Sequence, residues 1–128
     1  MLRFFTATFI VLHGLVHLWY FSLSQRLVPF KPEMGWTGRS WLFSPLLDSA
    51  ATRAVAGPLY VLATIAFVVA GGAFFVGAEW ERSLLVAAAI LSSALILLFW
   101  DGGLHMWMEK GFIGLLINLL LLLALWLR

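Results

Sequence analysis

The sequence predicts an all-α integral membrane protein: a four-helix bundle with a long loop and a short interfacial helix between helices one and two. Three observations lead to this fold class. Hydrophobic residues make up 63% of the 128 residues, charged residues make up only 11%, and the mean hydropathy is +1.02. Because an unpaired charge is costly to bury in hydrocarbon, long stretches without ionisable side chains belong inside a lipid bilayer.

Four apolar segments are long enough to cross a hydrocarbon core of about 30 Å, which takes roughly 20 helical residues. Helices are expected because every backbone N–H and C=O of a spanning segment must find its hydrogen bond within the protein. The spans are expected at residues 2–23, 58–77, 83–100 and 112–127, in a single transmembrane domain of residues 1–128.

Local signals set the limits of the spans. Pro58 suits the first turn of the second span, and Asp101-Gly102-Gly103 ends the third span. Residues 78–82 form such a short connection that the second and third spans must be antiparallel neighbours. Arg128 closes the last span.

The first connection, residues 24–57, is long for a helical bundle. It contains several prolines and glycines together with Trp36 and Trp41. Ser44-Pro45 has the residue types of an N-cap and a first helical turn, which predicts a short helix from there to about Ala56. Its aromatic and basic residues predict that the segment lies in the membrane interface or folds over the mouth of the bundle.

Four spans place both chain ends on one side of the membrane and loops one and three on the other. Loops one and three carry more Lys and Arg, so the positive-inside rule places them in the cytoplasm. The basic residues on the loop side are Arg26, Lys31, Arg39, Arg53 and Lys110, and those on the other side are Arg3, Arg82 and Arg128.

The sequence lacks several residue types and motifs, and their absence excludes several kinds of functional site. The chain has no cysteine, which excludes disulfides, thiolate catalysis and cysteine-ligated iron–sulfur or zinc sites. It has no basic cluster, so nucleic acid is not an expected partner. Nucleotide-binding loops and the G-x-S-x-G elbow are absent too. The expected partners are the lipid bilayer and other membrane subunits or further copies of the chain.

The topology gathers scarce polar and aromatic residues at the loop one/three end of the bundle. Asp101, His105 and Glu109 recur every fourth residue and would share a face if the fourth span began early. Gly102-Gly103 instead favours an ordinary solvated helix start. No residue is expected to be catalytic. The candidate ligand- or cofactor-binding residues are His13, His17, Tyr20, Trp100, Asp101, His105 and Asn118.

His13 and His17 are four residues apart, so their imidazoles lie one helical turn apart on the same face. Such a polar stripe on a membrane helix faces the bundle interior or a wet cavity. One interpretation is structural, with neutral imidazoles bonded across helices to Thr64, Tyr60, Ser92 or Asn118. The alternatives are a metal site of His13 and His17 completed by His105, Asp101 or Glu109, a haem with one of these histidines and His105 as axial ligands, or contact with a quinone. The H-x-x-x-H spacing alone does not choose between them.

Asn118 lies in the middle of the otherwise apolar fourth span. Its amide needs partners, so it should face another helix, above all the first, either as a packing contact or as part of a ligand cavity. Inward stripes of similar character are expected on the second and third spans. They comprise Tyr60, Thr64, Phe67 and Gly71 on one and Ser92 and Ser93 on the other.

Three short motifs accompany the four spans: His13-Gly-Leu-Val-His17, Trp100-Asp101 at the end of span three, and Gly114-x-x-x-Asn118. In these motifs and in its length the chain resembles the small four-helix bacterial membrane proteins grouped as DoxX-like. The resemblance implies a bacterial or archaeal cell membrane. Some members of this group are linked to quinone-coupled oxidoreductases as membrane subunits, while many have no assigned activity, so the resemblance only leans toward such a link. The tryptophan-rich first loop and His105 depart from the pattern.

Three functional hypotheses follow. The first is a non-catalytic accessory or anchor subunit of a membrane complex, with a pocket for a hydrophobic ligand such as a quinone or haem at the loop one/three end. The second is a redox or metal-dependent oxidoreductase subunit that uses His13, His17 and His105. The third is a small oligomeric transporter, which the lack of an intramembrane carboxylate or lysine disfavours.

Overall fold

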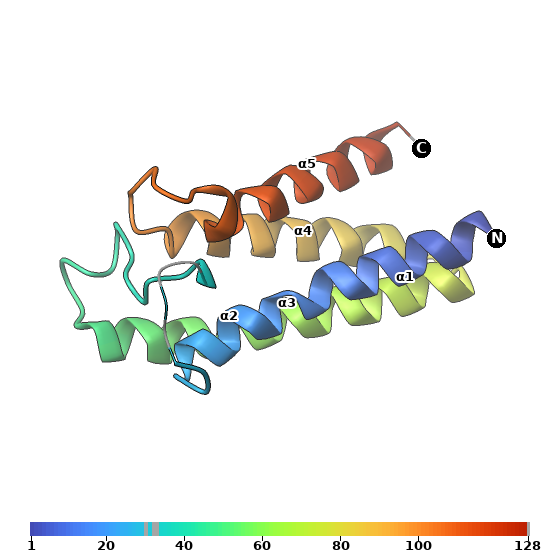
Figure 1. Cartoon of the computed structure of the whole chain (residues 1–128). Helices are drawn as coiled ribbons and strands as arrows, with labels where there is room; N and C mark the ends of the chain where they lie inside the picture. Colours follow the sequence, from blue (N-terminus) through green and yellow to red (C-terminus); the bar gives the residue numbers. More distant parts are fainter. Residues whose placement is uncertain (30, 32–33, 128) are drawn as a thin grey trace.

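A computed structural model describes residues 1–29, 31 and 34–127. Its regular structure is helical, and four segments are long and apolar enough to cross a membrane, which confirms the predicted fold class (Figure 1). Apart from the start of α3, the segment ends lie within four residues of the predicted limits. The elements are α1 (Leu2–Leu15), α2 (His17–Ser24), α3 (Ser49–Val76), α4 (Glu81–Leu98), the π-helical turn η2 (Met108–Phe112) and α5 (Ile113–Trp126).

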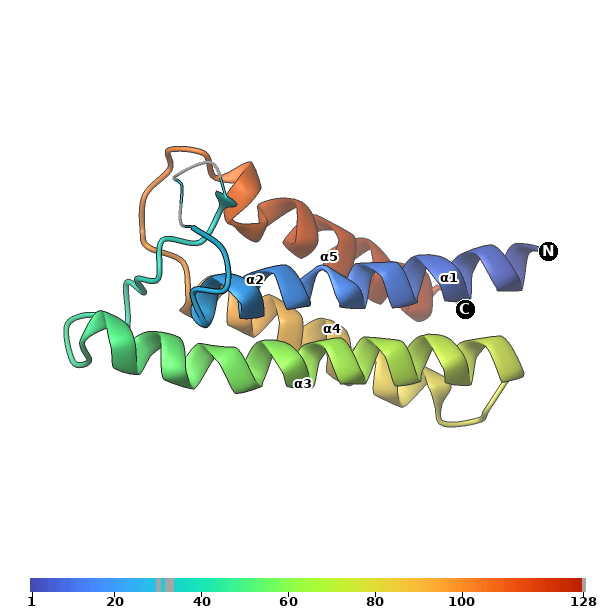
Figure 2. The same cartoon turned by 60° about the horizontal axis from the view of Figure 1, so that its bottom comes forward.

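The helix α3 makes contacts on two sides of the bundle. It packs against α1 and α2 and also against α4, while α5 packs against α4. Both chain ends lie at one end of the bundle, and loops one and three lie at the opposite end (Figures 1 and 2). This arrangement brings residues that are distant in sequence together at the loop one/three end.

The start of α3 differs from the sequence prediction. The chain makes turns around Ser44, and one continuous helix begins at Ser49 and includes Pro58. The side chain of Asp48 caps this helix by accepting a hydrogen bond from the Ala51 N–H at 2.7 Å. The predicted short interfacial helix is thus the first turns of α3, because the alanine-rich stretch before Pro58 continues the helix without a break.

Two apolar clusters fill the interior, one toward the chain ends and one toward loops one and three. The first contains Ile10, Phe67, Ala70, Leu85, Ala88, Ala89 and Leu125, and the second contains Leu23, Trp36, Ala56, Tyr60, Ala63, Leu95 and Phe99. Near their junction lie buried polar side chains of α1, α2, α4 and α5. In lipid, helices associate by close packing and interhelical hydrogen bonds rather than by apolar burial.

Two glycines allow α1 and α3 to approach closely. A Cβ atom added at Gly14 would lie 2.5 Å from the Cβ of Phe67. One added at Gly71 would lie 2.6 Å from the Cγ2 of Val11. Both distances are far below van der Waals contact, so any side chain at these positions would push the two helices apart.

Side chains of loop one hydrogen-bond to the carbonyl groups at the end of α4. A helix leaves its last four carbonyls without partners inside the helix. Here the Nε1 of Trp41 donates to Leu97 at 2.7 Å, the Oγ of Ser40 donates to Leu98, and the Nε1 of Trp36 donates to Phe99 at 2.9 Å. Loop one therefore folds over the mouth of the bundle, one of the two positions predicted for it.

Candidate functional site

Hydrogen bonds join the buried polar side chains of four helices into one network. The Nε2 of His13 lies 2.8 Å from the Oδ1 of Asn118, and the Nε2 of His17 lies 2.7 Å from the Oγ of Ser92. The Asn118 amide nitrogen donates to Ser92 at 2.9 Å and to Ser93 at 3.1 Å. As predicted, Asn118 faces the first helix, and both imidazoles bond across helices.

The break between α1 and α2 sets the direction of these hydrogen bonds. The Nδ1 of His17 lies 3.0 Å from the carbonyl oxygen of Gly14, which can only accept, so Nδ1 carries the hydrogen. In a neutral imidazole the Nε2 is then an acceptor, and the Ser92 hydroxyl donates to it. The Ser92 oxygen accepts from Asn118, whose amide oxygen accepts from His13. This pairing favours one register of the helices, because unpaired polar groups in hydrocarbon are costly.

A cavity of about 270 Å³ lies beside the network, toward the loop one/three end. His13, His17 and Ser92 line it and are buried. Its exposed lining residues are all apolar, namely Val16, Met108 and Ile113. They belong to the α1–α2 connection, to η2 and to α5, so the cavity opens between these elements, and the partly buried Lys110 also lines it.

Aromatic rings form another wall of this cavity. The rings of Tyr20 and Tyr60 stack with centroids 5.4 Å apart, and Trp36 and Phe99 pack on Tyr60 at 5.7 and 5.9 Å. The Tyr20 hydroxyl donates to the carbonyl of Glu109 at 3.1 Å. No described residue hydrogen-bonds to the Tyr60 hydroxyl, and its oxygen is not among the fully buried unpaired atoms, so it is accessible from the cavity. The wall therefore carries an unpaired hydrogen-bonding group.

The predicted ligand-binding residues fall into two groups. Those at the cavity or bonded to its lining are His13, His17, Tyr20 and Asn118. Trp100 does not line it, because its Nε1 donates to the carbonyl of Gly103 at 2.9 Å and its ring packs edge-on against Phe112. His105 is exposed on loop three.

The metal site predicted from His13, His17 and His105 is not assembled. No three His, Cys, Asp or Glu side chains within residues 1–29, 31 and 34–127 are placed to share a metal ion. The helix-one imidazoles turn their Nε2 atoms to Asn118 and Ser92, whereas His105 lies in turns before η2. These turns also explain why Asp101, His105 and Glu109 share no helical face.

Asp101 stabilises loop three rather than lining the cavity. Its Oδ1 accepts hydrogen bonds from the Lys110 ammonium and from the Gly103 N–H, each at 2.9 Å. Burial alone would raise the pKa of Asp101, but these two hydrogen bonds and the charge of Lys110 together lower that pKa below its usual value. Lys110 also donates to the Gly103 carbonyl at 3.2 Å, so this ion pair fastens the start of the fourth segment.

The predicted ligand-binding set omitted three aromatic residues that line the cavity. Tyr60 belonged only to the predicted inward stripe of the second span. A hydrophobic pocket was expected near the tryptophans of loops one and three, but Trp36 itself was not singled out, because tryptophan in a loop beside a membrane is most simply explained as an interface anchor. Phe99, at the end of α4, is equally ordinary in an apolar span.

No protein-family model, curated protein or solved structure matches this chain. The resemblance to the DoxX-like group stays a prediction.

Proposed function

We propose that the protein is a non-catalytic integral membrane subunit that holds a ring-shaped hydrophobic ligand of the quinone class in the 270 Å³ cavity. The polar end of the ligand would point to the Tyr60 hydroxyl, beside His17 and Ser92, which are already bonded to each other. Its apolar tail would pass between the α1–α2 connection and α5 into the bilayer. Ligand sites of this kind are mostly apolar, with a few placed polar groups that set orientation.

The Tyr60 hydroxyl is the observation that carries this proposal. No described residue hydrogen-bonds to this hydroxyl, and its oxygen is not among the fully buried unpaired atoms, so it is reachable from the cavity that Tyr60 lines. A ligand carbonyl oxygen placed there would accept its hydrogen, and a net hydrogen bond of this kind contributes about 1 kcal/mol. A quinone offers carbonyl oxygens on a flat apolar ring, which suits a wall of stacked aromatic side chains.

The geometry favours a quinone over a haem. A volume of about 270 Å³ falls just below the range of roughly 300–1,000 Å³ typical of sites for drug-sized ligands. It suits a single ring better than a four-ring macrocycle. A haem iron also needs an imidazole nitrogen directed at it. The Nε2 atoms of His13 and His17 are instead engaged with Asn118 and Ser92.

A role as a subunit of a larger membrane assembly is the second part of the proposal. The outer face of α5 is apolar, with Leu116 and Leu119 exposed by 56% and 62%. Such a face suits lipid or the transmembrane helix of a partner. The resemblance to the DoxX-like group agrees with this role, since some of its members are linked to quinone-coupled oxidoreductases.

A titration with decylubiquinone would test the proposal. The purified protein in detergent should show saturable quenching of tryptophan fluorescence, since Trp36 packs on Tyr60. Tyr60→Phe should weaken binding about fivefold, because a net hydrogen bond contributes about 1 kcal/mol. Ser93→Ala is a matched control for Ser92→Ala, because only Ser92 lines the cavity.

Binding should be unchanged in Ser93→Ala and weakened in Ser92→Ala. Quenching that does not saturate, or an equal affinity of wild type and Tyr60→Phe, would refute quinone binding at this cavity. Circular dichroism of each variant would verify that the helices are retained.

A further inference from the structure

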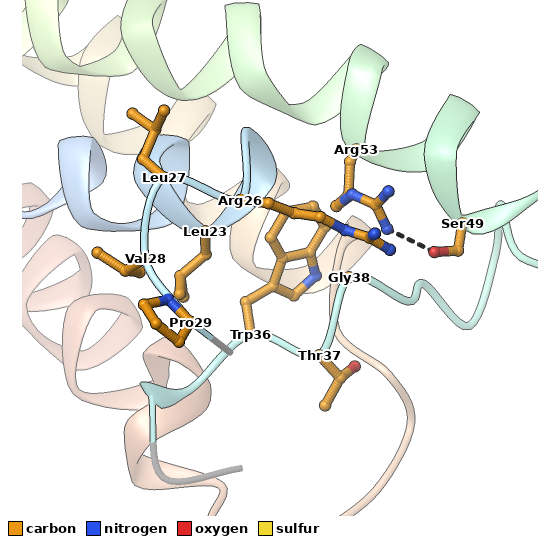
Figure 3. A pocket seen from close by; sticks show the side chains of 10 residues that line it. All are labelled: Leu23, Arg26, Leu27, Val28, Pro29, Trp36, Thr37, Gly38, Ser49 and Arg53. Atoms are coloured by element: carbon orange, nitrogen blue, oxygen red, sulfur yellow. Dashed lines mark hydrogen bonds between the residues drawn. The ribbon is translucent and has the colours of Figure 1, made fainter. Parts of the chain in front are cut away.

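A second cavity, of about 610 Å³, lies under loop one and is lined by two arginines (Figure 3). Arg26 follows α2 and Arg53 belongs to the first turns of α3. Trp36 lines this cavity as well as the smaller one. The other lining residues are mostly apolar or small, namely Leu23, Leu27, Val28, Pro29, Thr37, Gly38 and Ser49.

Arg26 occupies a backbone position that normally belongs to glycine. Its φ is +53°, and its N–H donates to the Leu23 carbonyl at 3.1 Å while the Leu27 N–H donates to the Ser22 carbonyl at 3.0 Å. This is the Schellman ending of a helix, in which the left-handed residue is usually glycine. Met106 in loop three is left-handed as well, so the conformation fixes where the Arg26 side chain leaves the helix end and does not by itself assign it a role.

Arg53 lies against loop one at Gly38, a residue without a side chain. A Cβ atom added at Gly38 would lie 3.5 Å from the Cδ of Arg53. One guanidinium nitrogen of Arg53 donates to the Oγ of Ser49 at 2.5 Å. In Figure 3 the side chain of Arg26 reaches across Trp36 toward Arg53, so the two guanidinium groups face the same cavity.

Neither arginine has an ion-pair partner among the described residues. The ion pairs found there join Arg3 to Glu81 and Lys110 to Asp101, away from this cavity. Asp48 attracts Arg53 from nearby, but its Oδ1 accepts the Ala51 N–H as the cap of α3. Both guanidinium groups face this cavity, so their like charges oppose each other there. A bound anion would offset that repulsion.

We propose that Arg26 and Arg53 together bind a phosphate group. A planar guanidinium presents paired donors that match phosphate oxygens, and two of them can hold one phosphate from both sides. The cavity lies where the membrane spans end, and anionic lipids are recognised by basic pockets in this region. Its apolar lining fits the first carbons of a lipid and favours a phospholipid headgroup over free phosphate.

Native mass spectrometry of the full chain in detergent would test this site with phosphatidylglycerol, using phosphatidylcholine for comparison. Calorimetry with inorganic phosphate would form the second arm. Arg26→Gln and Arg53→Gln should each weaken phosphatidylglycerol binding about tenfold, as expected for loss of a charge-assisted hydrogen bond. Arg39→Gln is the matched control, because it removes the same charge from the same loop outside the cavity.

Arginine-dependent binding of phosphatidylglycerol alone would support the site with a lipid as its ligand. Arginine-dependent binding of inorganic phosphate would support it with a soluble ligand. An equal loss in Arg39→Gln, or binding that is unchanged in both cavity variants, would overturn it. Arg26→Gly provides a second test, because it removes the side chain while suiting the local backbone. It should lose binding and remain folded by circular dichroism.

Discussion

Replacing Asn118 with leucine should destabilise the bundle by about 2 kcal/mol. The leucine keeps the same branching at Cγ in the buried position but removes the hydrogen bonds to His13, Ser92 and Ser93. Interhelical hydrogen bonds in a membrane protein contribute about 0.6 kcal/mol each on average, with a maximum of about 1.7. Three such bonds give the expected loss, and the unpaired N–H of His13 adds to it.

The assay is reversible unfolding of the purified protein in mixed detergent and dodecyl sulfate micelles, followed by circular dichroism. Leu119→Ala is the control in the same helix, because Leu119 is 62% exposed on the outer face and should change the free energy of unfolding little. Combining Asn118→Leu with Ser92→Ala should give non-additive losses, since the two side chains share a hydrogen bond. An Asn118→Leu variant within about 0.5 kcal/mol of wild type would refute the role assigned to the network, given the average of about 0.6 per bond.

Three other predictions concern the backbone and loop three. Gly14→Ala should destabilise the protein by about 1–3 kcal/mol in the same unfolding assay, because its Cβ would overlap Phe67. Unchanged stability would mean that α1 and α3 are not in close contact. The carboxylate of Asp101 has a lowered pKa in the folded protein, so its stabilising effect is present above its unfolded pKa of about 3.9 and is lost as the pH falls through the folded value. Thermal stability should therefore fall on acidification below about pH 4. The fall should be less steep in Asp101→Asn, because the amide cannot pair with Lys110 as an anion. Identical pH profiles of wild type and variant would contradict the ion pair. Arg26→Gly should raise the free energy of unfolding by about 1 kcal/mol by relieving the left-handed backbone, and a lower value would contradict that strain.

The membrane spans could be predicted because a long apolar segment in lipid must satisfy its backbone hydrogen bonds internally, which leaves the helix as the available structure. The same logic located the buried polar network, since an imidazole pair and a lone amide in hydrocarbon must find each other or another polar group. Asn118 and His13 are 105 residues apart in sequence and are nonetheless bonded. Polar residues are scarce within these apolar segments, and this scarcity identified the two side chains as members of a hydrogen-bond network.

Features that depend on tertiary contacts could not be predicted. Ser44-Pro45 has the residue types of a helix start, but α3 begins at Ser49 with Asp48 as its N-cap. The helix then continues through Pro58 without a break. The tryptophans of loop one resemble interface anchors, whereas Trp36 and Trp41 bond to carbonyls at the end of α4. Glycine in a left-handed cap can be recognised from sequence, but Arg26 in that position cannot.

The most direct test of the proposed ligand site is the quinone content of the protein purified gently from its native membrane. Organic extraction followed by chromatography with mass detection would measure quinone per protein chain, in wild type and in Tyr60→Phe prepared in parallel. Ligand binding at the aromatic wall predicts a stoichiometric quinone in wild type and a clear loss in the variant. A folded wild-type protein without quinone, or equal quinone in both preparations, would contradict it.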